Sequence, residues 1–366
     1  MLAEASRLVG ANPRGAVRSC SLAVRAAMRA FIDEAGVPGA FVVGLSGGAD
    51  SLALALMAID VGSRAGIAVV TVTVDHGLRS GSGQEARLVA QRARSLGARA
   101  LVEAVSVSGV GGPEASARDA RIGALRAVAL REGAPVLLGH TMDDQAETVL
   151  LRLARGSGPS SLRAIAPRRR DEDGVTWLRP LLGLRRSDTA GACAQVGLTP
   201  VEDPTNAPDG PWRAADGSAL RRTAVRHGAI PALASALGVD PVPALARTAA
   251  LCALDDDALN GWASELVATT AVRARRGNGA SSLRVDDLRV LPAAVRTRAL
   301  RRAAREAGVR TLASVHVDAL DRLVTAWRGQ GPILLPGGVA TRVGDGNEAT
   351  ILIEASRGMP AALRSQ

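Results

Sequence analysis

Residues 46–51 (SGGADS) combine backbone and side chains that could bind a polyphosphate. They lie between an apolar run and a helical pattern, and two adjacent glycines let the backbone turn tightly and direct its N–H groups at an anion. Ser46 and Ser51 supply hydroxyl donors, and Asp50 makes sense among phosphates mainly if a Mg²⁺ ion lies between them. The segment therefore predicts a site for phosphates and a divalent cation. The simpler alternative is a glycine-rich turn in which Asp50 caps the helix.

Residues 140–148 (HTMDDQAET) concentrate acids at the start of a predicted helix. Asp144 and Glu147 are three residues apart, and Asp143 and Glu147 are four apart, so the acids share one helix face. They repel one another unless a cation compensates, and the first neighbouring arginine in the sequence is Arg152. An acidic first turn favoured by the helix dipole explains Asp143 and Asp144 but explains Glu147 less well. A substrate ammonium group would compensate these acids well, and a carboxylate could then also accept the proton of an attacking amine.

Two histidines accompany these segments. His140 could move protons near neutral pH, because an unperturbed imidazole titrates in that range. It is equally able to hold its loop through a hydrogen bond, and the same two interpretations apply to His76.

The elements that position these side chains alternate between short apolar runs and helical patterns, which is typical of a parallel sheet flanked by helices. The expected strands cover residues 40–45, 67–74, 99–107 and 135–139, and the expected helices cover 51–61, 84–97, 114–132 and 143–154. We predict an α/β fold with a doubly wound, Rossmann-like parallel sheet. Ligands of such sheets bind at the carboxyl ends of the strands, where residues 46–51, 75–79 and 140–144 all fall.

The composition excludes several chemistries. All 45 Lys+Arg residues are arginines, so no Schiff-base lysine, Walker A loop or protein-kinase lysine is present. The formal charge of +10 suits a polyanionic partner, although it also serves solubility. Cys20, Cys193 and Cys252 lie far apart, which makes zinc and iron–sulfur sites improbable. No apolar stretch approaches a membrane span or a signal peptide, and we expect a cytoplasmic protein.

Five segments carry a resemblance to a known family. Residues 46–51 resemble the pyrophosphate loop (PP-loop) of the ATP pyrophosphatase superfamily, whose members cleave ATP between the α and β phosphates to adenylate a substrate. The other four make residues 40–230 similar to the tRNA(Ile)-lysidine synthetase family; they are residues 74–79 (VDHGLR), 139–148 (GHTMDDQAET), 179–182 (RPLL) and 202–206 (EDPTN). Two positions depart from the family pattern: Ile122 replaces a usual aromatic residue, and Thr223 replaces a common asparagine.

The resemblance implies a two-step reaction on RNA. ATP adenylates carbon-2 of the wobble cytidine in an isoleucine tRNA with a CAU anticodon, and the side-chain amine of free lysine then displaces AMP to leave lysidine. ATP is thus a substrate, Mg²⁺ is the expected ion, and tRNA and lysine are the expected partners, with no membrane involved. The sequence leaves open whether the chain forms a homodimer.

The motif positions imply roles for individual residues. The expected ATP-binding residues are Ser46, Gly47, Gly48, Ala49, Asp50, Ser51, Asp75, His76 and Arg79, with Asp50 as the Mg²⁺ ligand. The expected catalytic residues are Asp50, Asp144, Glu147 and His140, and the expected lysine-binding residues are Asp144, Glu147 and Arg226. The expected tRNA-binding residues are Arg118, Arg121, Arg221, Arg222, Arg298, Arg301 and Arg305. The last three share a helical stripe, for which a solvated helix face is the alternative.

The composition changes near residue 220, where strand patterns fade and helical spacing of Ala, Leu and Arg takes over. We expect a PP-loop ATP-binding catalytic domain at 1–220, a mainly helical substrate- and tRNA-binding domain at 221–345, and a terminal strand with a flexible tail at 346–366. A strand pair is predicted within residues 332–343, around the turn Pro336-Gly337-Gly338.

Three other functions remain open from the sequence. A tRNA thiolase shares the PP-loop but usually needs paired cysteines, and a small-molecule amide-forming synthetase shares the loop but needs no basic second domain. A non-catalytic nucleotide- or RNA-binding protein would keep the glycines, but it has no reason to place Asp50, Asp144 and Glu147 around one crevice.

Overall fold

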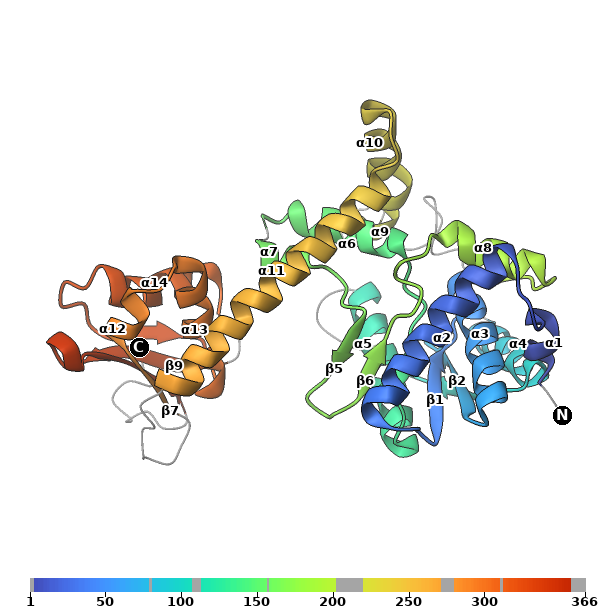
Figure 1. Cartoon of the computed structure of the whole chain (residues 1–366), viewed down its shortest axis with the longest axis horizontal. Coiled ribbons are helices and arrows are strands. Elements are labelled where there is room, and N and C mark those ends of the chain that lie inside the picture. Colours follow the sequence, from blue (N-terminus) through green and yellow to red (C-terminus); the bar gives the residue numbers. More distant parts are fainter. Residues whose placement is uncertain are drawn as a thin grey trace. The chain divides into compact units, whose positions relative to one another are not determined.

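The computed structural model describes residues 3–78, 81–106, 113–156, 158–201, 220–270, 280–309 and 312–356, without the side chains of 113, 114 and 270. Its contacts divide the chain into two compact units, Met1–Leu251 and Cys252–Gln366 (Figure 1). This division lies further along the chain than the change in composition near residue 220. It falls inside the long helix α11 (Pro241–Thr270).

A six-stranded sheet forms the centre of the first unit, in the order β3-β2-β1-β4-β6-β5. All neighbouring strands are parallel except β5, which pairs antiparallel with β6. The strands are β1 (Ala40–Gly44), β2 (Ala68–Asp75), β3 (Arg99–Ala104), β4 (Val136–Leu137), β5 (Arg168–Arg170) and β6 (Thr176–Leu178). The doubly wound parallel sheet is confirmed, and β5 and β6 extend it beyond the four strands that the sequence predicts.

Helices cover both faces of this sheet (Figure 1). Along β1, Phe41 and Val43 belong to the core formed with α1–α4 and α8, whereas Ala40 and Val42 belong to the core formed with α5. This alternation follows from the period of two in a strand. The helices up to α8 are α1 (Glu4–Val9), α2 (Gly15–Ala35), α3 (Ala49–Ala65), α4 (Ser82–Leu96), α5 (Pro113–Glu132), α6 (Met142–Leu153), α7 (Pro159–Leu162) and α8 (Arg186–Gln195).

The strand order reverses between β1 and β4. The crossovers from β1 to β2 and from β2 to β3 pack α3 and α4 on one face, whereas the crossover from β3 to β4 packs α5 on the other. The carboxyl ends of β1 and β4 therefore flank the switch point, where an open parallel sheet binds its ligands.

A helical region follows and contains α9 (Arg221–Ala224), η2 (Val225–Ala229), α10 (Ile230–Leu237) and α11. None of the described helices alone has the length and hydropathy to cross a membrane; residues 221–237 and 241–269 meet that test only as a pair, across a bend of 102°.

The second unit packs helices against an antiparallel sheet in the order β7-β10-β9-β8. The predicted strand pair is confirmed as β8 and β9, whereas β7 and most of the helix bounds were not predicted. The elements are β7 (Ala280–Arg284), α12 (Val285–Arg289), α13 (Ala293–Glu306), α14 (Ser314–Thr325), β8 (Ile333–Leu335), β9 (Gly338–Val343), η3 (Gly346–Glu348) and β10 (Thr350–Ala355). The expected terminal strand is thus β10, which lies between β7 and β9 inside this sheet.

Candidate active site

The glycine-rich bend between β1 and α3 is stabilised by hydrogen bonds that the Ser51 hydroxyl group makes within it. The backbone N–H of Ser46 donates to Ser51 Oγ at 3.1 Å, and Ser51 Oγ donates to the Gly48 carbonyl at 3.0 Å. Gly47 has a φ of +90°, and a Cβ there would lie 2.8 Å from Val89 Cγ2. The bend therefore requires glycine at position 47. Gly48 is the N-cap of α3 and has no side chain to offer as a cap.

The end of β4 lies directly against the start of α3. A Cβ on Gly139 would be 2.9 Å from the Asp50 carbonyl oxygen and 3.1 Å from the Ser51 nitrogen. Only glycine permits this approach, which brings the two segments together although about ninety residues separate them in the sequence. The residues that follow Gly139 consequently lie next to the PP-loop.

The Asp50 carboxylate is oriented from α8. Thr189 Oγ1 donates a hydrogen bond to Asp50 Oδ1, and Arg186 Nε lies 3.5 Å from Asp50 Oδ2. Burial raises the pKa of Asp50, and these two partners oppose that rise. Sequence reasoning missed both partners, for which only the neighbouring RPLL motif gives a signal.

Arginines from two other elements compensate the acids of α6. Arg186 Nη2 lies 3.1 Å from Asp144 Oδ1 and 3.3 Å from Glu147 Oε1. Arg226 Nε lies 2.7 Å from Glu147 Oε1, and the Glu147 side chain is fully buried. The acids therefore have cationic partners within the chain: Arg226, which was expected at this site, and Arg186, which was not. Arg152 instead donates to the Ser161 and Ala164 carbonyl groups.

Asp144 also stabilises the start of α6. Its Oδ2 accepts hydrogen bonds from the Thr141 N–H at 2.8 Å and from Thr141 Oγ1 at 3.0 Å. Burial tends to raise the pKa of Asp144, but the Arg186 guanidinium and the Thr141 N–H outweigh it, so the pKa is lowered. Asp144 thus remains charged at neutral pH.

Asp143 has different hydrogen-bond partners from those of Asp144 and Glu147. It accepts hydrogen bonds from Arg185 Nη2 at 3.0 Å and from the Arg186 N–H at 2.8 Å. Asp143 therefore anchors the start of α8, which places it outside the cluster of Asp144, Glu147, Arg186 and Arg226.

His140 lies half-buried beside this cluster. Its Nδ1 has no hydrogen-bond partner among the residues that the structure describes. Burial lowers its pKa to about 3; the Asp144 charge opposes this change, and Arg179, Arg121 and Arg118 add to it. The imidazole is accordingly neutral at neutral pH, so the expected titration of His140 near pH 7 does not occur in this state.

Several arginines lie near the same acids. The pKa of the half-buried Arg121 is lowered, first by burial and then by the positive charges of Arg118 and Arg222. Arg222 Nη2 donates to Thr148 Oγ1 at 3.4 Å, on the same helix as the acid pair. Arg118, Arg121 and Arg222 thus place positive charge beside the acid pair of α6. We call these three arginines the positive rim. Arg221 is exposed on α9.

Asp75 lies at the carboxyl end of β2. Its Oδ1 accepts hydrogen bonds from Ser82 Oγ at 2.6 Å and from the Gly77 N–H at 3.0 Å, which lower its pKa, the Ser82 hydroxyl most strongly. His76 follows it in the chain. Arg79 and the segment 202–206 lie outside the described residues.

The two departures from the family pattern lie in helices. Ile122 lies in α5 and packs against the hydrophobic core between this helix and the sheet. Thr223 is buried in α9.

The predicted arginine stripe of the second unit is only partly on the surface. Arg298 Nη2 lies 2.9 Å from the buried Asp256, and the Arg298 side chain is 15% exposed. Arg301 donates to the Leu312 carbonyl at 2.9 Å, and burial lowers its pKa. Arg305 is exposed. Arg298 therefore joins α13 to α11 within this unit.

Comparison with known proteins gives matches over both units. Residues 22–233 match the PP-loop domain, and residues 283–346 match the TilS substrate binding domain. The tRNA(Ile)-lysidine synthase of Salinispora tropica is 48% identical over 322 residues, which cover 87% of this chain and 92% of that protein. Those of Streptomyces coelicolor (48% identity, covering 82% of each chain) and Thermobifida fusca (44% identity, covering 88% of this chain and 95% of that one) are similar. The chain therefore belongs to the tRNA(Ile)-lysidine synthase family.

Proposed function

We propose that this protein is an ATP-dependent tRNA(Ile)-lysidine synthetase, a ligase that forms a carbon–nitrogen bond. It adenylates carbon-2 of the wobble cytidine of an isoleucine tRNA with a CAU anticodon and then joins the side-chain amine of free lysine, which gives lysidine, AMP and pyrophosphate. As a tRNA-modifying enzyme it acts in the cytoplasm. The observation that carries the proposal is the position of the Arg186 guanidinium group. It contacts both Asp50 of the PP-loop and the acid pair Asp144 and Glu147.

The PP-loop serves the first half-reaction. The N–H groups of residues 47–51, in the bend and the first turn of α3, hold the phosphates of ATP and stabilise charge on the departing pyrophosphate. Asp50 fits a Mg²⁺ ligand, because this ion commonly takes one or two carboxylates and completes its coordination with phosphate oxygens and water. A bound cation would also stabilise the ionised form of Asp50, which burial disfavours, as the raised pKa of this group shows. When bound, the ion supplies neutralisation of phosphate charge.

The acid pair serves the second half-reaction. Asp144 and Glu147 bind an ammonium group of lysine, and the lowered pKa of Asp144 keeps it ionised for that purpose. Arg226, which contacts Glu147, is available to the lysine carboxylate. The proton of the attacking amine passes to a carboxylate of this cluster.

Arg186 forms ion pairs with both acids of the pair. Its guanidinium lies where a substrate ammonium would make the same two ion pairs, at 3.1 and 3.3 Å. Lysine must therefore displace Arg186 from these acids. Because Arg186 Nε also contacts Asp50, the guanidinium group that lysine displaces from the acids stays beside the phosphates of ATP.

The positive rim serves the RNA. Arg118, Arg121 and Arg222 offer guanidinium groups to phosphates near the reacting nucleotide, at the edge of the site that holds the acids. Arg221, Arg301 and Arg305 are the further exposed candidates for RNA contact.

The test is reaction of the purified protein with ATP, lysine and an unmodified isoleucine tRNA, with nucleoside mass spectrometry as the readout. We expect lysidine at the wobble position of the CAU tRNA and none in a GAU isoacceptor. Turnover of ATP with lysine but without tRNA would instead indicate a small-molecule synthetase.

The cysteines of the first unit do not favour a tRNA thiolase. Cys20 and Cys193 are buried, and burial, as the main cause, raises their pKa to about 12 and about 11. Sulfur transfer needs a thiolate, which neither residue provides near neutral pH.

Replacing Arg186 with glutamine should have opposite effects on the two half-reactions: tighter binding of lysine and slower adenylation of the tRNA. We expect the Kd for lysine to fall about tenfold, because the acid pair loses a competing charge-assisted partner. Adenylation should slow, because Asp50 loses one of its two partners from α8. Isothermal titration with lysine and single-turnover adenylation measure the two effects.

The adjacent Arg185→Gln is the matched control, since Arg185 pairs with Asp143 and Asp240 rather than with the acid pair. It should leave the Kd for lysine within about threefold of the wild type. Weaker lysine binding by Arg186→Gln alone would show that Arg186 assists the substrate rather than competing with it.

A further inference from the structure

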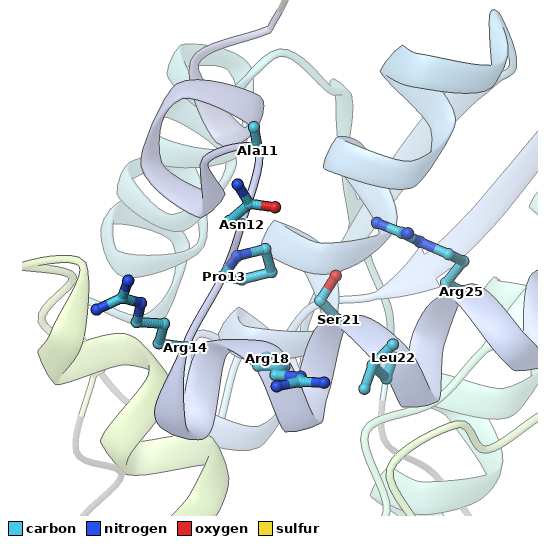
Figure 2. Close-up of a pocket in the computed structure, with 8 residues that line it drawn as sticks. All are labelled: Ala11, Asn12, Pro13, Arg14, Arg18, Ser21, Leu22 and Arg25. Atoms are coloured by element: carbon cyan, nitrogen blue, oxygen red, sulfur yellow. The ribbon is translucent and has the colours of Figure 1, made fainter.

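A pocket of about 350 Å³ lies beside the loop that joins α1 to α2, and none of the residues assigned above lines it (Figure 2). Loop residues 11–13 form one side, and α2 with its N-cap Arg14 forms the other. The polar residues that line it are Asn12, Arg14, Arg18, Ser21 and Arg25, and no acid is among them.

The three arginines of this pocket are not compensated within the described part of the chain. Arg14, Arg18 and Arg25 are exposed, and no described side chain forms an ion pair or hydrogen bond with their guanidinium groups. Nearby arginines differ, since Arg29 pairs with Asp33 and Arg64 pairs with Asp60. The pocket therefore presents a local excess of positive charge.

A buried hydroxyl group marks the same pocket. Ser21 is 1% exposed, and its Oγ has no hydrogen-bond partner among the described residues. A buried hydroxyl group without a partner is unfavourable, because it has lost its hydrogen bonds to water. Figure 2 shows the Ser21 hydroxyl and the Asn12 side chain facing the same space, toward which Arg25 extends from α2. An acceptor atom of a ligand in this space would satisfy the hydroxyl.

The start of α2 adds to the attraction for anions. No acid lies in the first turn of α2, so no carboxylate offsets the positive end of its dipole; one N–H group of this turn, that of Val17, donates to the Gln195 side chain. Guanidinium groups, a hydroxyl, an amide and a helix N-terminus together are the donors that bind phosphate.

We propose that this pocket binds phosphate groups of the RNA backbone of the substrate. The inference rests on the proposed function, which makes RNA the substrate. At 1.5 Å per residue, Arg14 and Arg25 are about 16 Å apart along α2, and the successive phosphates of an RNA strand can cover such a span.

The pocket is attached to the helix that orients Asp50. Gln195, at the end of α8, donates from Nε2 to the Arg14 carbonyl at 3.1 Å and accepts from the Val17 N–H at 3.4 Å. These contacts link the start of α2, which lines the pocket, to α8, which carries Thr189 and Arg186. This surface contributes to affinity for tRNA and makes no contact with lysine.

The test compares tRNA binding by the double variant Arg18→Gln/Arg25→Gln with the wild type over a range of salt concentrations. Loss of two phosphate contacts should flatten the slope of log K against log salt by about 1.4–1.8, which weakens binding about 25- to 60-fold at 0.1 M salt. The matched control is Arg29→Gln/Arg131→Gln, which removes the same charge from arginines that pair with Asp33 and Glu103. Its slope should stay within about 0.3 of the wild type.

Equal slopes for the two double variants would overturn the proposal, because bulk charge would then explain the effect. Thermal stabilisation by inorganic phosphate that only Arg18→Gln/Arg25→Gln loses, with tRNA binding unchanged, would also overturn it and indicate a small-anion site. Ser21→Ala, which removes only the hydroxyl, should weaken tRNA binding about three- to tenfold at constant melting temperature. Because binding is measured without ATP or lysine, a protein that binds tRNA but makes no lysidine would refute the proposed function and leave this test valid.

Discussion

Asp50→Asn should slow formation of the tRNA adenylate by about 100- to 1000-fold, the usual effect of removing one electrostatic group from a reacting centre. The amide keeps the shape of the side chain and can still accept the hydrogen bond from Thr189. It removes the charge that we assign to Mg²⁺ and to Arg186. Single-turnover transfer of label from α-³²P-ATP to tRNA, at saturating Mg²⁺, measures the effect.

Asp240→Asn provides the matched control, because it removes one negative charge that contacts α8 through Arg185 but lies outside the PP-loop. It should adenylate tRNA at a rate within about threefold of the wild type. Adenylation by Asp50→Asn at the control rate would remove Asp50 from the reaction.

Glu147→Gln should raise the Kd for lysine about 30-fold or more and leave adenylation nearly unchanged. Truncating one partner of a buried charge pair costs about 2–5 kcal/mol, and Glu147 is fully buried between Arg186 and Arg226. The lysine dependence of lysidine formation from preformed tRNA adenylate measures the effect, and a thermal melt checks the fold.

Asp143→Asn is the control for this variant, since Asp143 belongs to the same acidic turn but binds Arg185 and the start of α8. Its affinity for lysine should stay within about threefold of the wild type. If Glu147→Gln lost both half-reactions equally, the assignment of Glu147 to lysine would fail.

The arrangement of the site follows largely from local signals in the sequence. Apolar runs of β-branched residues predict β1 and β2, and the glycines before Asp50 predict the bend that follows β1. Because the carboxyl ends of parallel strands meet at one edge, the sequence also predicts that the PP-loop and the segment 140–148 converge. The structure adds that Gly139 makes this approach sterically possible.

The cations within the site could not be predicted from such local patterns: the family resemblance implied Arg226, and nothing in the sequence indicated Arg186. Arg186 and Arg226 reach Glu147 across 39 and 79 positions of the chain, and no periodic pattern records contacts of that range. Among 45 arginines, none stands out by type. The same limit explains why Arg298 looks like part of a surface stripe although its partner is the buried Asp256.

The short strands were missed for a different reason. The strand β5 consists of three exposed arginines, and β6 has only three residues, so neither shows the apolar run or the alternation on which strand prediction depends. The pairing of β6 with β4, and of β5 with β6 at the edge of the sheet, is a tertiary effect.

The most direct test of the account follows the α phosphate of ATP through the reaction. With α-³²P-ATP, Mg²⁺ and CAU isoleucine tRNA but no lysine, we predict label attached covalently to the tRNA, and addition of lysine should release it as AMP while lysidine appears. Label found on lysine, or AMP released at the same rate without tRNA, would contradict the claim that the PP-loop presents ATP to RNA.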